Sequence, residues 1–346
     1  MKVIIISPHP SFGGSSTANQ NIAKSIACAG HDVIYMDEYY PEELKSKAGL
    51  NIDSYPVHRN KVLKQFATYR YLRSLEPDAI IFGVPIIGVF MWLAALLLRI
   101  RGIKTCCIFH SLSLSKSLSG RMTDALISCF ASTCSKLFFV SDYTLVSWMK
   151  FWPLKFKKKS AYVIFNPIEM KPGTKSSNTP TPFIVGFVGR FSNEKQPLLF
   201  CETAKALSNN TNIRFVAFGD GPLLEECKEK YSVNVEFKGY SNDIDKIYKD
   251  MSILLMTSEF ENCPMAILES AARGIPAIAP KVGGIPEIVK PGYNGELFIE
   301  YSTESITKEI EKITGSYSAY SQNAFNEARS FTIETISAKW DKTLKN

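Results

Sequence analysis

The sequence predicts an α/β protein built from two doubly wound domains in succession. The chain has 346 residues and is 45% hydrophobic, which is enough for two packed cores. Short apolar runs alternate with stretches of helical spacing almost throughout. Residues 167–182 lose that periodicity and gather Pro, Gly, Ser and Thr, as a linker does. We therefore expect an N-terminal domain over 1–166 and a C-terminal domain over 183–330.

The N-terminal domain begins with a βαβ pattern. An apolar run at 2–7 is followed by a loop rich in Pro, Gly and Ser, a helix over 17–29 and a second run at 31–36. Helical stretches separate several of the later runs, which favours one parallel sheet. The further strands that we expect lie at residues 79–83, 105–110, 137–141 and 162–166.

One apolar segment raises the question of a membrane span. Residues 79–98 are 20 uncharged residues, which is long enough to cross a bilayer. Gly83, Pro85 and Gly88 divide this segment into a short run, a turn and a helical stretch. We favour a buried strand followed by a helix.

The C-terminal domain repeats the alternation, with room for a helix in every gap between strands. The chain then ends at 331–346 in a segment whose Ile333, Ile336 and Trp340 have helical spacing, which predicts an amphipathic C-terminal helix. The strands expected in this domain lie at residues 183–189, 213–219, 235–240, 252–258, 276–280 and 295–298.

The eight cysteines favour reduced thiols. They show no CxxC pair or regular spacing, and several lie in apolar runs. No secretory signal precedes the first strand, so we expect a cytoplasmic location without disulfides or a zinc site.

The net charge of +7 belongs to one region of the chain. Residues 101–175 contain 12 Lys and Arg but only 3 Asp and Glu. The rest of the chain contains 28 Lys and Arg and 30 Asp and Glu, so it is close to neutral. Within that region, residues 150–160 interleave lysines with aromatic residues, a pattern that suits anionic lipid head groups. A solvated loop is the alternative, and no nucleic-acid module accompanies the charge. The predicted membrane patch consists of Trp152, Lys155, Lys157, Lys158 and Lys159.

Open α/β sheets bind ligands beyond the carboxyl ends of their strands, so the residues there are the candidates for function. Gly13 and Gly14 precede the first helix, where a glycine backbone can approach a phosphate closely, although turn glycines are often structural. His110 ends the strand at 105–110. An imidazole there can hydrogen-bond a substrate hydroxyl or balance developing charge, or simply pack in a turn.

Two cations follow the first strand of the C-terminal domain. Arg190 comes directly after that strand, and Lys195 lies near the start of a helix that we expect from about Gln196. Fixed cations beside a helix N-terminus suit a diphosphate, because charge-assisted hydrogen bonds contribute about 1.5 to 3 kcal/mol each.

Two glutamates flank the start of a later helix. Glu261 lies in the loop after the strand at 252–258, Pro264 suits the first helical turn, and Glu269 falls inside the helix. The two carboxylates can then lie near one cleft at different heights and bind hydroxyls on two separate rings. A capping acid or a solvated helix acid would explain either residue alone. A glycine pair follows the next strand at 283–284 and offers another close backbone approach.

An Asp-x-Asp pair at Asp243 and Asp245 raises the possibility of a metal site. Ser241, Asn242 and Asp243 are better suited to begin a helix, where acids are favoured near the positive end. We expect no metal site.

The segment from Glu261 to Glu269, together with the glycines and cations before it, resembles the nucleotide-sugar glycosyltransferases of the GT-B fold, specifically the retaining glycosyltransferase family 4. The resemblance is dense in the C-terminal domain and thinner in the N-terminal one. The residues that carry it are GGSS at 13–16, the Gly189-Arg190 pair with Lys195, FGDGP at 218–222, ENCPMAILESAARGIP at 261–276, VGGIPEIV and GYNGELF.

This resemblance implies two Rossmann-like domains facing a cleft, with the C-terminal helix returning to the N-terminal domain. It implies that Glu261 contacts the donor sugar as the catalytic acid and that His110 stands near the transferred sugar. Arg190 and Lys195 would bind the diphosphate, and Glu269 would hold the ribose. Where the family commonly has glycine, this chain has Asn262, which tolerates left-handed backbone conformations. The implied donor contacts are Gly13, Gly14, Arg190, Lys195, Gly219, Asn262, Cys263, Pro264, Met265 and Glu269.

The implied activity is transfer of a sugar from a nucleotide-diphosphate donor to a glycan acceptor with retention of configuration and without a cofactor. Together with the membrane patch, this favours a peripheral enzyme on the inner face of the cytoplasmic membrane that extends a lipid-linked glycan, as in O-antigen, capsule or lipopolysaccharide synthesis. A nucleotide-sugar 2-epimerase of the same architecture and a non-catalytic sugar-nucleotide binding protein are the alternatives. A dinucleotide oxidoreductase would need a glycine fingerprint that this chain lacks.

Overall fold

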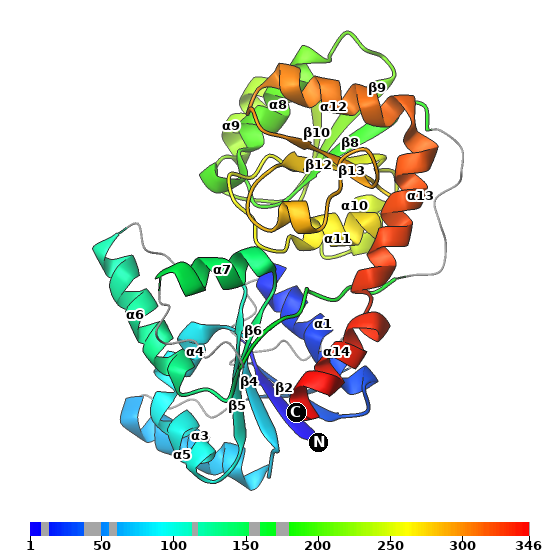
Figure 1. Cartoon of the computed structure of the whole chain (residues 1–346). Helices are drawn as coiled ribbons and strands as arrows, with labels where there is room; N and C mark the ends of the chain where they lie inside the picture. The colour runs from blue at the N-terminus through cyan, green and yellow to red at the C-terminus, as the bar shows by residue number, and fades with distance from the viewer. Residues whose placement is uncertain are drawn as a thin grey trace. The chain divides into compact units, whose positions relative to one another are not determined.

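The computed structural model describes residues 1–7, 14–37, 50–54, 61–112, 117–151, 160–170 and 180–345. The chain forms two compact units, the first made of residues 1–167 and 332–346 and the second of residues 168–331. Each unit is built on one sheet whose paired strands are parallel (Figure 1). The predicted fold class, two doubly wound α/β domains, is therefore confirmed.

The first unit contains a seven-stranded sheet in the order β3-β2-β1-β4-β5-β6-β7. The sequence prediction missed β3, because only Ile52 is apolar within it; an edge strand is buried against a neighbour on one side only. The strands are β1 Lys2–Ile6, β2 Asp32–Asp37, β3 Asn51–Ser54, β4 Ala79–Phe82, β5 Lys104–Phe109, β6 Lys136–Phe139 and β7 Ala161–Val163.

The segment that raised the question of a membrane span is folded into this unit. Residues 79–82 form β4 and are completely buried. Pro85 then begins a short helix, and a Cβ atom at Gly88 would lie 2.0 Å from the ring of Phe130, so glycine allows the helix to pack closely. In the part of the chain that the structure describes, no helix is both long enough and apolar enough to span a bilayer. The prediction of a buried strand followed by a helix is confirmed.

The helices of the first unit follow the strands in the expected alternation. The first of them begins at Gly14, three residues before the predicted start. They are α1 Gly14–Cys28, α3 Lys61–Ser74, α4 Pro85–Phe90, α5 Trp92–Ile100, α6 Leu118–Ser132, α7 Asp142–Phe151 and α14 Ile333–Lys345.

The second unit contains a six-stranded sheet in the order β10-β9-β8-β11-β12-β13. Tilted and edge-on phenylalanine rings pack in its core, with Phe187, Phe200 and Phe215 in successive contact at centroid distances of 5.5 and 5.6 Å. Of the predicted linker at 167–182, residues 171–179 lie outside the described residues. The strands are β8 Phe183–Val188, β9 Ile213–Phe218, β10 Val235–Gly239, β11 Ile253–Leu255, β12 Ala277–Pro280 and β13 Gly295–Phe298.

All strands predicted for this unit are present, and the helices fill the gaps between them. In the described part of this unit, short 3₁₀ turns at 193–195, 285–287 and 329–331 supplement the helices. The α-helices are α8 Pro197–Ala206, α9 Leu224–Tyr231, α10 Ile244–Tyr248, α11 Met265–Ala271, α12 Thr303–Gly315 and α13 Tyr317–Ala328.

The C-terminal helix α14 packs against α1 of the first unit. Its last carbonyl groups have no intrahelical partners, and two lysines at the starts of β5 and β6 supply hydrogen bonds to them. Lys104 Nζ donates to the Leu344 carbonyl at 2.8 Å, and Lys136 Nζ donates to the Thr343 carbonyl. Positive charge at a helix C-terminus also interacts favourably with the helix dipole.

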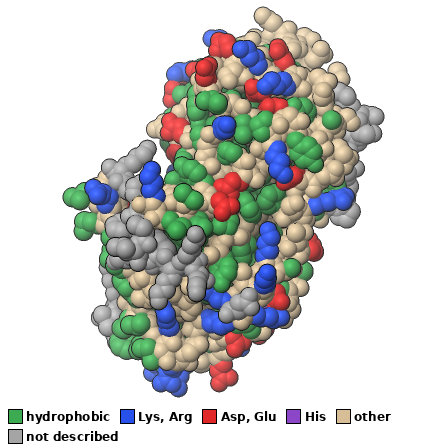
Figure 2. Space-filling view, in the orientation of Figure 1, with side chains coloured by type: hydrophobic (Ala, Val, Ile, Leu, Met, Phe, Trp, Pro, Cys, Tyr) green, Lys and Arg blue, Asp and Glu red, His purple; other side chains and the backbone are tan. Residues whose placement is uncertain are grey.

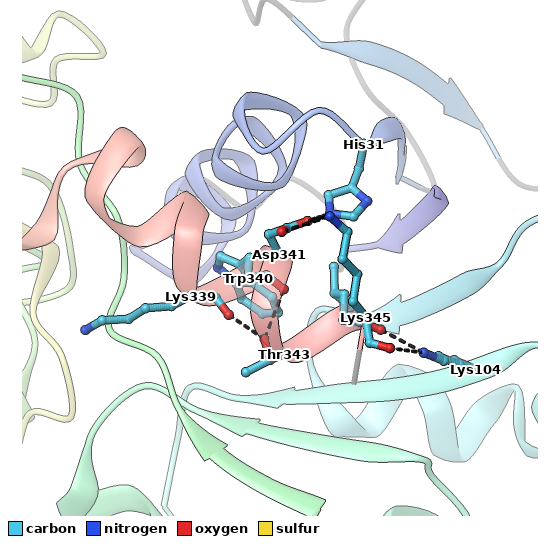
Figure 3. A network of polar contacts seen from close by, with 8 residues as sticks. His31, Lys104, Lys339, Trp340, Asp341, Thr343 and Lys345 are labelled. Carbon is cyan, nitrogen blue, oxygen red and sulfur yellow. Dashed lines mark hydrogen bonds and ion pairs between the residues drawn. The ribbon is translucent and has the colours of Figure 1, made fainter.

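A second contact to the same helix comes from His31. His31 Nε2 lies 3.0 Å from Asp341 Oδ1, and Figure 3 shows this contact beside the Lys104 hydrogen bonds. Burial lowers the pKa of His31, so the neutral ring donates to Asp341 at neutral pH. Together with His31, Lys104 and Lys136 attach α14 to the first unit, so these two lysines of the strongly basic region stabilise the fold.

We expect Lys136→Met to weaken the attachment of α14. The variant keeps most of the apolar stem but leaves the partly buried Thr343 carbonyl without its donor, which costs about 1 to 3 kcal/mol. Chemical denaturation should show this loss, and hydrogen exchange should show reduced protection in α14. The matched control is Lys238→Met, which removes an exposed surface ion pair and should change stability by less than about 0.5 kcal/mol. Equal losses in the two variants would contradict this role.

Candidate functional site

The strand order of the second sheet reverses between β8 and β11. From β8 the chain continues outward to β9 and β10, whereas β11 leads to β12 and β13 on the other side. Ligands of open α/β sheets bind at such a reversal, beyond the carboxyl ends of the strands. Arg190 and Lys195 follow β8, and Glu261 follows β11. The structure thus places these predicted residues on the two loops that flank the reversal.

Lys195 and Glu261 form an ion pair across these loops. Lys195 lies in the 3₁₀ turn just before α8, and its Nζ atom contacts Glu261 Oε1. Ser258 Oγ donates a hydrogen bond to the same oxygen at 3.0 Å. The Lys195 and Glu261 side chains remain 28% and 13% exposed. The sequence analysis assigned these residues to different parts of a ligand, and the structure shows that their side chains contact each other.

The glycine pair after β12 supports the backbone of Glu261. Gly284 donates its N–H to the Glu261 carbonyl at 3.0 Å, and a Cβ atom at Gly283 would lie only 1.8 Å from that oxygen. Gly283 also has φ +57°, a conformation that other residues rarely adopt. The close backbone approach of these glycines is therefore to the loop that carries Glu261.

Gly219 has a similar place beside the loop after β8. A Cβ atom at Gly219 would lie 1.8 Å from the Gly189 carbonyl, directly before Arg190. The exposed Arg190 side chain is therefore carried by a backbone that Gly219 supports. The donor contact implied for Gly219 stays a prediction.

Glu269 lies within α11 in a largely buried environment. Tyr248 donates its hydroxyl to Glu269 Oε2 at 3.1 Å. Burial raises the pKa of Glu269 to about 7, although the Tyr248 hydrogen bond and the Arg273 guanidinium favour the charged form. Glu269 therefore changes charge near neutral pH.

The residues that follow Glu261 can contact a ligand mainly through backbone groups, because most of their side chains are buried. Cys263, Pro264 and Met265 are buried, and Asn262 is partly exposed. Pro264 is the N-cap residue of α11, one position before the predicted first turn.

In the first unit, the strand order reverses between β1 and β4. His110 directly follows β5, the neighbour of β4, and its Nε2 atom lies 2.9 Å from Oδ1 of Asn19 on α1. Burial lowers the pKa of His110 to about 4, so its imidazole is neutral at pH 7. Gly14 is the exposed first residue of α1. Gly13 and the predicted membrane patch of Trp152, Lys155, Lys157, Lys158 and Lys159 lie outside the described residues.

Asn19 is a candidate that sequence reasoning missed. The sequence did contain a signal for it. Asn19 is a polar residue on the apolar face of the helix, beside Ala18, Ile22 and Ala23.

The Asp-x-Asp pair belongs to the fold of the second unit. Asp243 is the N-cap of α10 and accepts a hydrogen bond from the Lys246 amide at 3.1 Å. Asp245 pairs with Arg273 at 2.7 Å. The interpretation of these residues as a helix start is confirmed. Across the described ranges, no group of three or more His, Cys, Asp or Glu side chains could hold a metal ion.

Comparison with known proteins places the second unit in a functional context. Residues 173–329 match the family described as glycosyl transferases group 1. A UDP-Gal:alpha-D-GlcNAc-diphosphoundecaprenol alpha-1,3-galactosyltransferase of Escherichia coli is 32% identical over 38% of this chain and 36% of its own length. The O-antigen biosynthesis glycosyltransferase WbnH of E. coli is 27% identical over 53% of this chain and 52% of its own length. The matches thus span about a third to a half of these relatives.

A solved structure matches the whole chain. Anabaena HepE in complex with UDP-glucose superposes with a TM-score of 0.81 at 18% identity, over 100% of this chain and 99% of that one. The predicted GT-B fold is therefore confirmed, and residues 173–329 of the second unit are similar to glycosyl transferases group 1.

The raised pKa of Glu269 predicts a pH-dependent stability. Between the unfolded value of 4.5 and the folded value of about 7, the folded chain holds a proton that the unfolded chain has released. Stability should therefore fall as the pH rises through this window. Relative to the parent, Glu269→Gln should gain on the order of 3 kcal/mol between pH 4 and pH 8.

Unfolding free energies of the parent and the variant across that range test this expectation. Glu229→Gln, an exposed acid on α9, is the matched control. Parallel pH profiles for the parent and Glu269→Gln would show that the carboxyl group is not buried as described.

Proposed function

We propose that this protein is a retaining glycosyltransferase that moves a sugar from a nucleotide-diphosphate donor to a glycan acceptor. The observation that carries the proposal is the Lys195–Glu261 ion pair at the reversal of the second sheet, with Arg190 exposed on the same loop as Lys195. It brings together a cation for a phosphate and a carboxylate for sugar hydroxyls. The match of residues 173–329 to glycosyl transferases group 1 supports it.

In this proposal the donor diphosphate competes with Glu261 for Lys195. A diphosphate offers more negative charge than one carboxylate, and Arg190 adds a second cation beside it. Once Lys195 turns to the phosphate, the Glu261 carboxylate is available to accept hydrogen bonds from sugar hydroxyls. Glu269, in its charged form, accepts hydrogen bonds from the ribose.

The proposed reaction is a front-side displacement at the anomeric carbon. The acceptor hydroxyl oxygen bonds to that carbon on the face from which the diphosphate leaves, and the hydroxyl proton passes to the departing phosphate oxygen. Positive charge develops on the sugar beside Glu261, while negative charge develops on the phosphate beside Arg190 and Lys195. Each 1.4 kcal/mol of such stabilisation is about tenfold in rate, and no covalent nucleophile is needed. A relative named as an alpha-transferase using UDP-Gal supports retention.

We propose a lipid-linked acceptor in bacterial surface-polysaccharide synthesis. One relative is named for a diphosphoundecaprenol-linked acceptor and another for O-antigen biosynthesis. The enzyme would then work at the cytoplasmic face of the inner membrane, bound to the anionic surface through the lysines at 155–159. UDP-sugars are the first donors to screen, since both the galactosyltransferase relative and HepE are named with them.

A described surface of the first unit adds a second way to reach the membrane. Leu93, Leu96 and Ile100 form an exposed apolar stripe on α5, beside Arg99 and Arg101. Figure 2 shows hydrophobic and basic side chains close together in the area where α3 and α5 lie in Figure 1. Apolar side chains that enter the interface, with cations at the head groups, are the usual composition of a peripheral membrane contact.

Substitutions of the site residues should affect donor affinity and turnover differently, according to the role of each residue. Arg190→Ala and Lys195→Ala should each weaken donor affinity by about 1.5 to 3 kcal/mol, because each removes a cation from the diphosphate. Glu261→Gln should lower turnover strongly with a smaller effect on donor affinity, because its charge is needed most beside the developing positive charge. Glu269→Gln should chiefly weaken donor affinity, because its contacts exist before and during the reaction.

Donor affinity, turnover and product configuration, measured for the parent and the four variants, test these roles. Lys205→Ala, an exposed lysine on α8, is the control for loss of one cation. A β-linked product from an α-linked donor would reject retention, and full turnover by Glu261→Gln would reject its catalytic role. Epimerised sugar from donor alone would identify an epimerase, and tight donor binding without turnover of any acceptor would identify a binding protein.

Membrane binding should depend on both surfaces. Replacing Lys155, Lys157, Lys158 and Lys159 with Gln should reduce sedimentation with anionic vesicles, most strongly at low salt, because salt screens exposed charges. Leu96→Ser with Ile100→Ser should reduce it at every salt concentration, because the lost contact is apolar.

A variant with the same loss of charge in the second unit is the control. It replaces four exposed or partly exposed lysines with Gln, and it should bind vesicles like the parent. If the variant without the four lysines at 155–159 binds vesicles like the parent, the segment does not bind the membrane and the solvated-loop interpretation is correct. The control lysines are Lys228, Lys230, Lys308 and Lys312.

A further inference from the structure

Gln196 has an unusual backbone conformation beside Lys195. It lies between the 3₁₀ turn that carries Lys195 and the start of α8, and its φ and ψ angles are +48° and +52°. This left-handed conformation is costly for a residue with a Cβ atom. In the part of the chain that the structure describes, Glu76 is the other non-glycine residue with positive φ, and it follows the end of α3, where left-handed residues are common. Gln196 instead directly precedes a helix, where the N-cap residue is usually extended.

The sequence offers Gln196 a less strained alternative. Pro197 follows it, and a proline ring disfavours the right-handed helical conformation in the preceding residue. The conformation favoured before proline is extended, and any residue can adopt it. A change from left-handed to extended at Gln196 would redirect the 3₁₀ turn, and Lys195 with it, relative to α8. The left-handed conformation therefore persists only if other contacts hold it.

Thr257 supplies two of these contacts from the neighbouring strand end. It lies two residues after β11 and has no exposed surface. Its Oγ1 atom lies 2.8 Å from the Lys195 carbonyl oxygen and 2.9 Å from the Gln196 carbonyl oxygen. A threonine hydroxyl has one hydrogen, so the two carbonyls share one donor. In an extended chain successive carbonyls point to opposite sides, so one hydroxyl could not reach both.

Two further hydrogen bonds join the same two loops. Gln196 Nε2 donates to Glu259 Oε1, and the Glu259 amide donates to the Glu194 carbonyl at 2.8 Å. The backbone is thus held on both sides of Lys195. The Lys195 side chain contacts Glu261 and remains 28% exposed. The backbone of Lys195 is therefore fixed by the fold, whereas its side chain can change partners.

We propose that Thr257 is a positioning residue that holds Gln196 in the left-handed conformation and thereby fixes the backbone of Lys195 for a phosphate group. The phosphate part of this inference rests on the proposed function. In this arrangement only the side chain of Lys195 turns when it leaves Glu261 for a diphosphate. A backbone that is fixed before binding loses no conformational freedom on binding, so more of the interaction contributes to affinity.

The strain at Gln196 is measured on the full chain without a ligand. Gln196→Gly should unfold at a higher denaturant midpoint than Gln196→Ala, because glycine adopts the left-handed conformation without a steric penalty. Glu202, an exposed residue within α8, is the control. There the order should be reversed, with Glu202→Gly below Glu202→Ala, because glycine weakens a helix interior. The control order at Gln196 would overturn the strained conformation.

Hydrogen exchange of the Glu259 amide tests whether Thr257 holds the two loops together. Thr257→Val keeps the shape of the side chain but removes the hydroxyl, so this amide should exchange about tenfold faster than in the parent. Thr203→Val is the matched control. Thr203 is also fully buried in the second unit, and its hydroxyl donates to the Leu199 carbonyl at 2.8 Å. Parent-like exchange at Glu259 in Thr257→Val would overturn the positioning role.

UDP affinity, measured by calorimetry, tests the part that concerns a phosphate. Thr257→Val should weaken UDP binding about fivefold, because Lys195 no longer presents a fixed cation. Thr257→Ser keeps the hydroxyl and should restore the affinity. In the Gln196→Gly background, Thr257→Val should weaken binding by less than about twofold, because glycine carries no strain that the hydroxyl must offset. Equal losses in the two backgrounds would show that Thr257 does not act through Gln196.

The two parts of the inference fail separately. If Thr257→Val changes the exchange of Glu259 but binds UDP like the parent, the role in phosphate binding is overturned while the proposed function stands. If the parent binds neither UDP nor any other nucleotide diphosphate, the proposed function is overturned, and the exchange result decides the positioning of the backbone. If Thr257→Val does not fold, Thr257→Ala gives the same comparisons, since it also lacks the hydroxyl.

Discussion

The reversal of strand order in each parallel sheet is the constraint on which both groups of candidate residues depend. Helices that leave β8 and β11 in opposite directions along the sheet cannot both cover the strand ends between them. The loops there must be fixed by other contacts. In the second unit backbone packing does this, with Gly219 against the Gly189 carbonyl and Gly283 against the Glu261 carbonyl. In the first unit the buried amide of Asn19 does it.

The two glutamates of the second unit show how burial gives the same side chain different properties. Glu261 remains beside solvent and is neutralised by Lys195, so its charge is available once the cation finds another partner. Glu269 is only partly exposed on α11 and has no lysine partner among the described residues, and desolvation raises its pKa to about 7 in spite of Tyr248 and Arg273. The cost of desolvation exceeds the gain from these two neighbours. One acid can therefore respond to a bound anion and the other to pH.

The basic region of the chain is likewise divided by its surroundings. Lys104 and Lys136 lie at the starts of their strands, at the sheet edge opposite the strand ends that carry His110, and they bind the last carbonyls of α14. A helix that ends a chain has free carbonyl groups and a partial negative charge, and these lysines satisfy both. Composition alone would have counted them with the cations that we propose for membrane binding. Their hydrogen bonds to the α14 carbonyls show that they hold the C-terminal helix.

The sequence by itself determined the fold class, the order of the elements and the loops where function is to be sought. Apolar periodicity is a local property, and among the described residues it identified every strand except β3, whose single apolar residue gives no pattern. It also placed Arg190, Lys195 and Glu261 at strand ends. Only the tertiary structure decided which of these residues meet. Lys195 and Glu261 are separated by 66 positions and become partners because β8 and β11 are neighbours, which periodicity does not encode. The pKa of Glu269, the need for glycine at 283 and the contact of His110 with Asn19 depend on atoms from distant segments, because desolvation, steric contact and hydrogen bonding act through space.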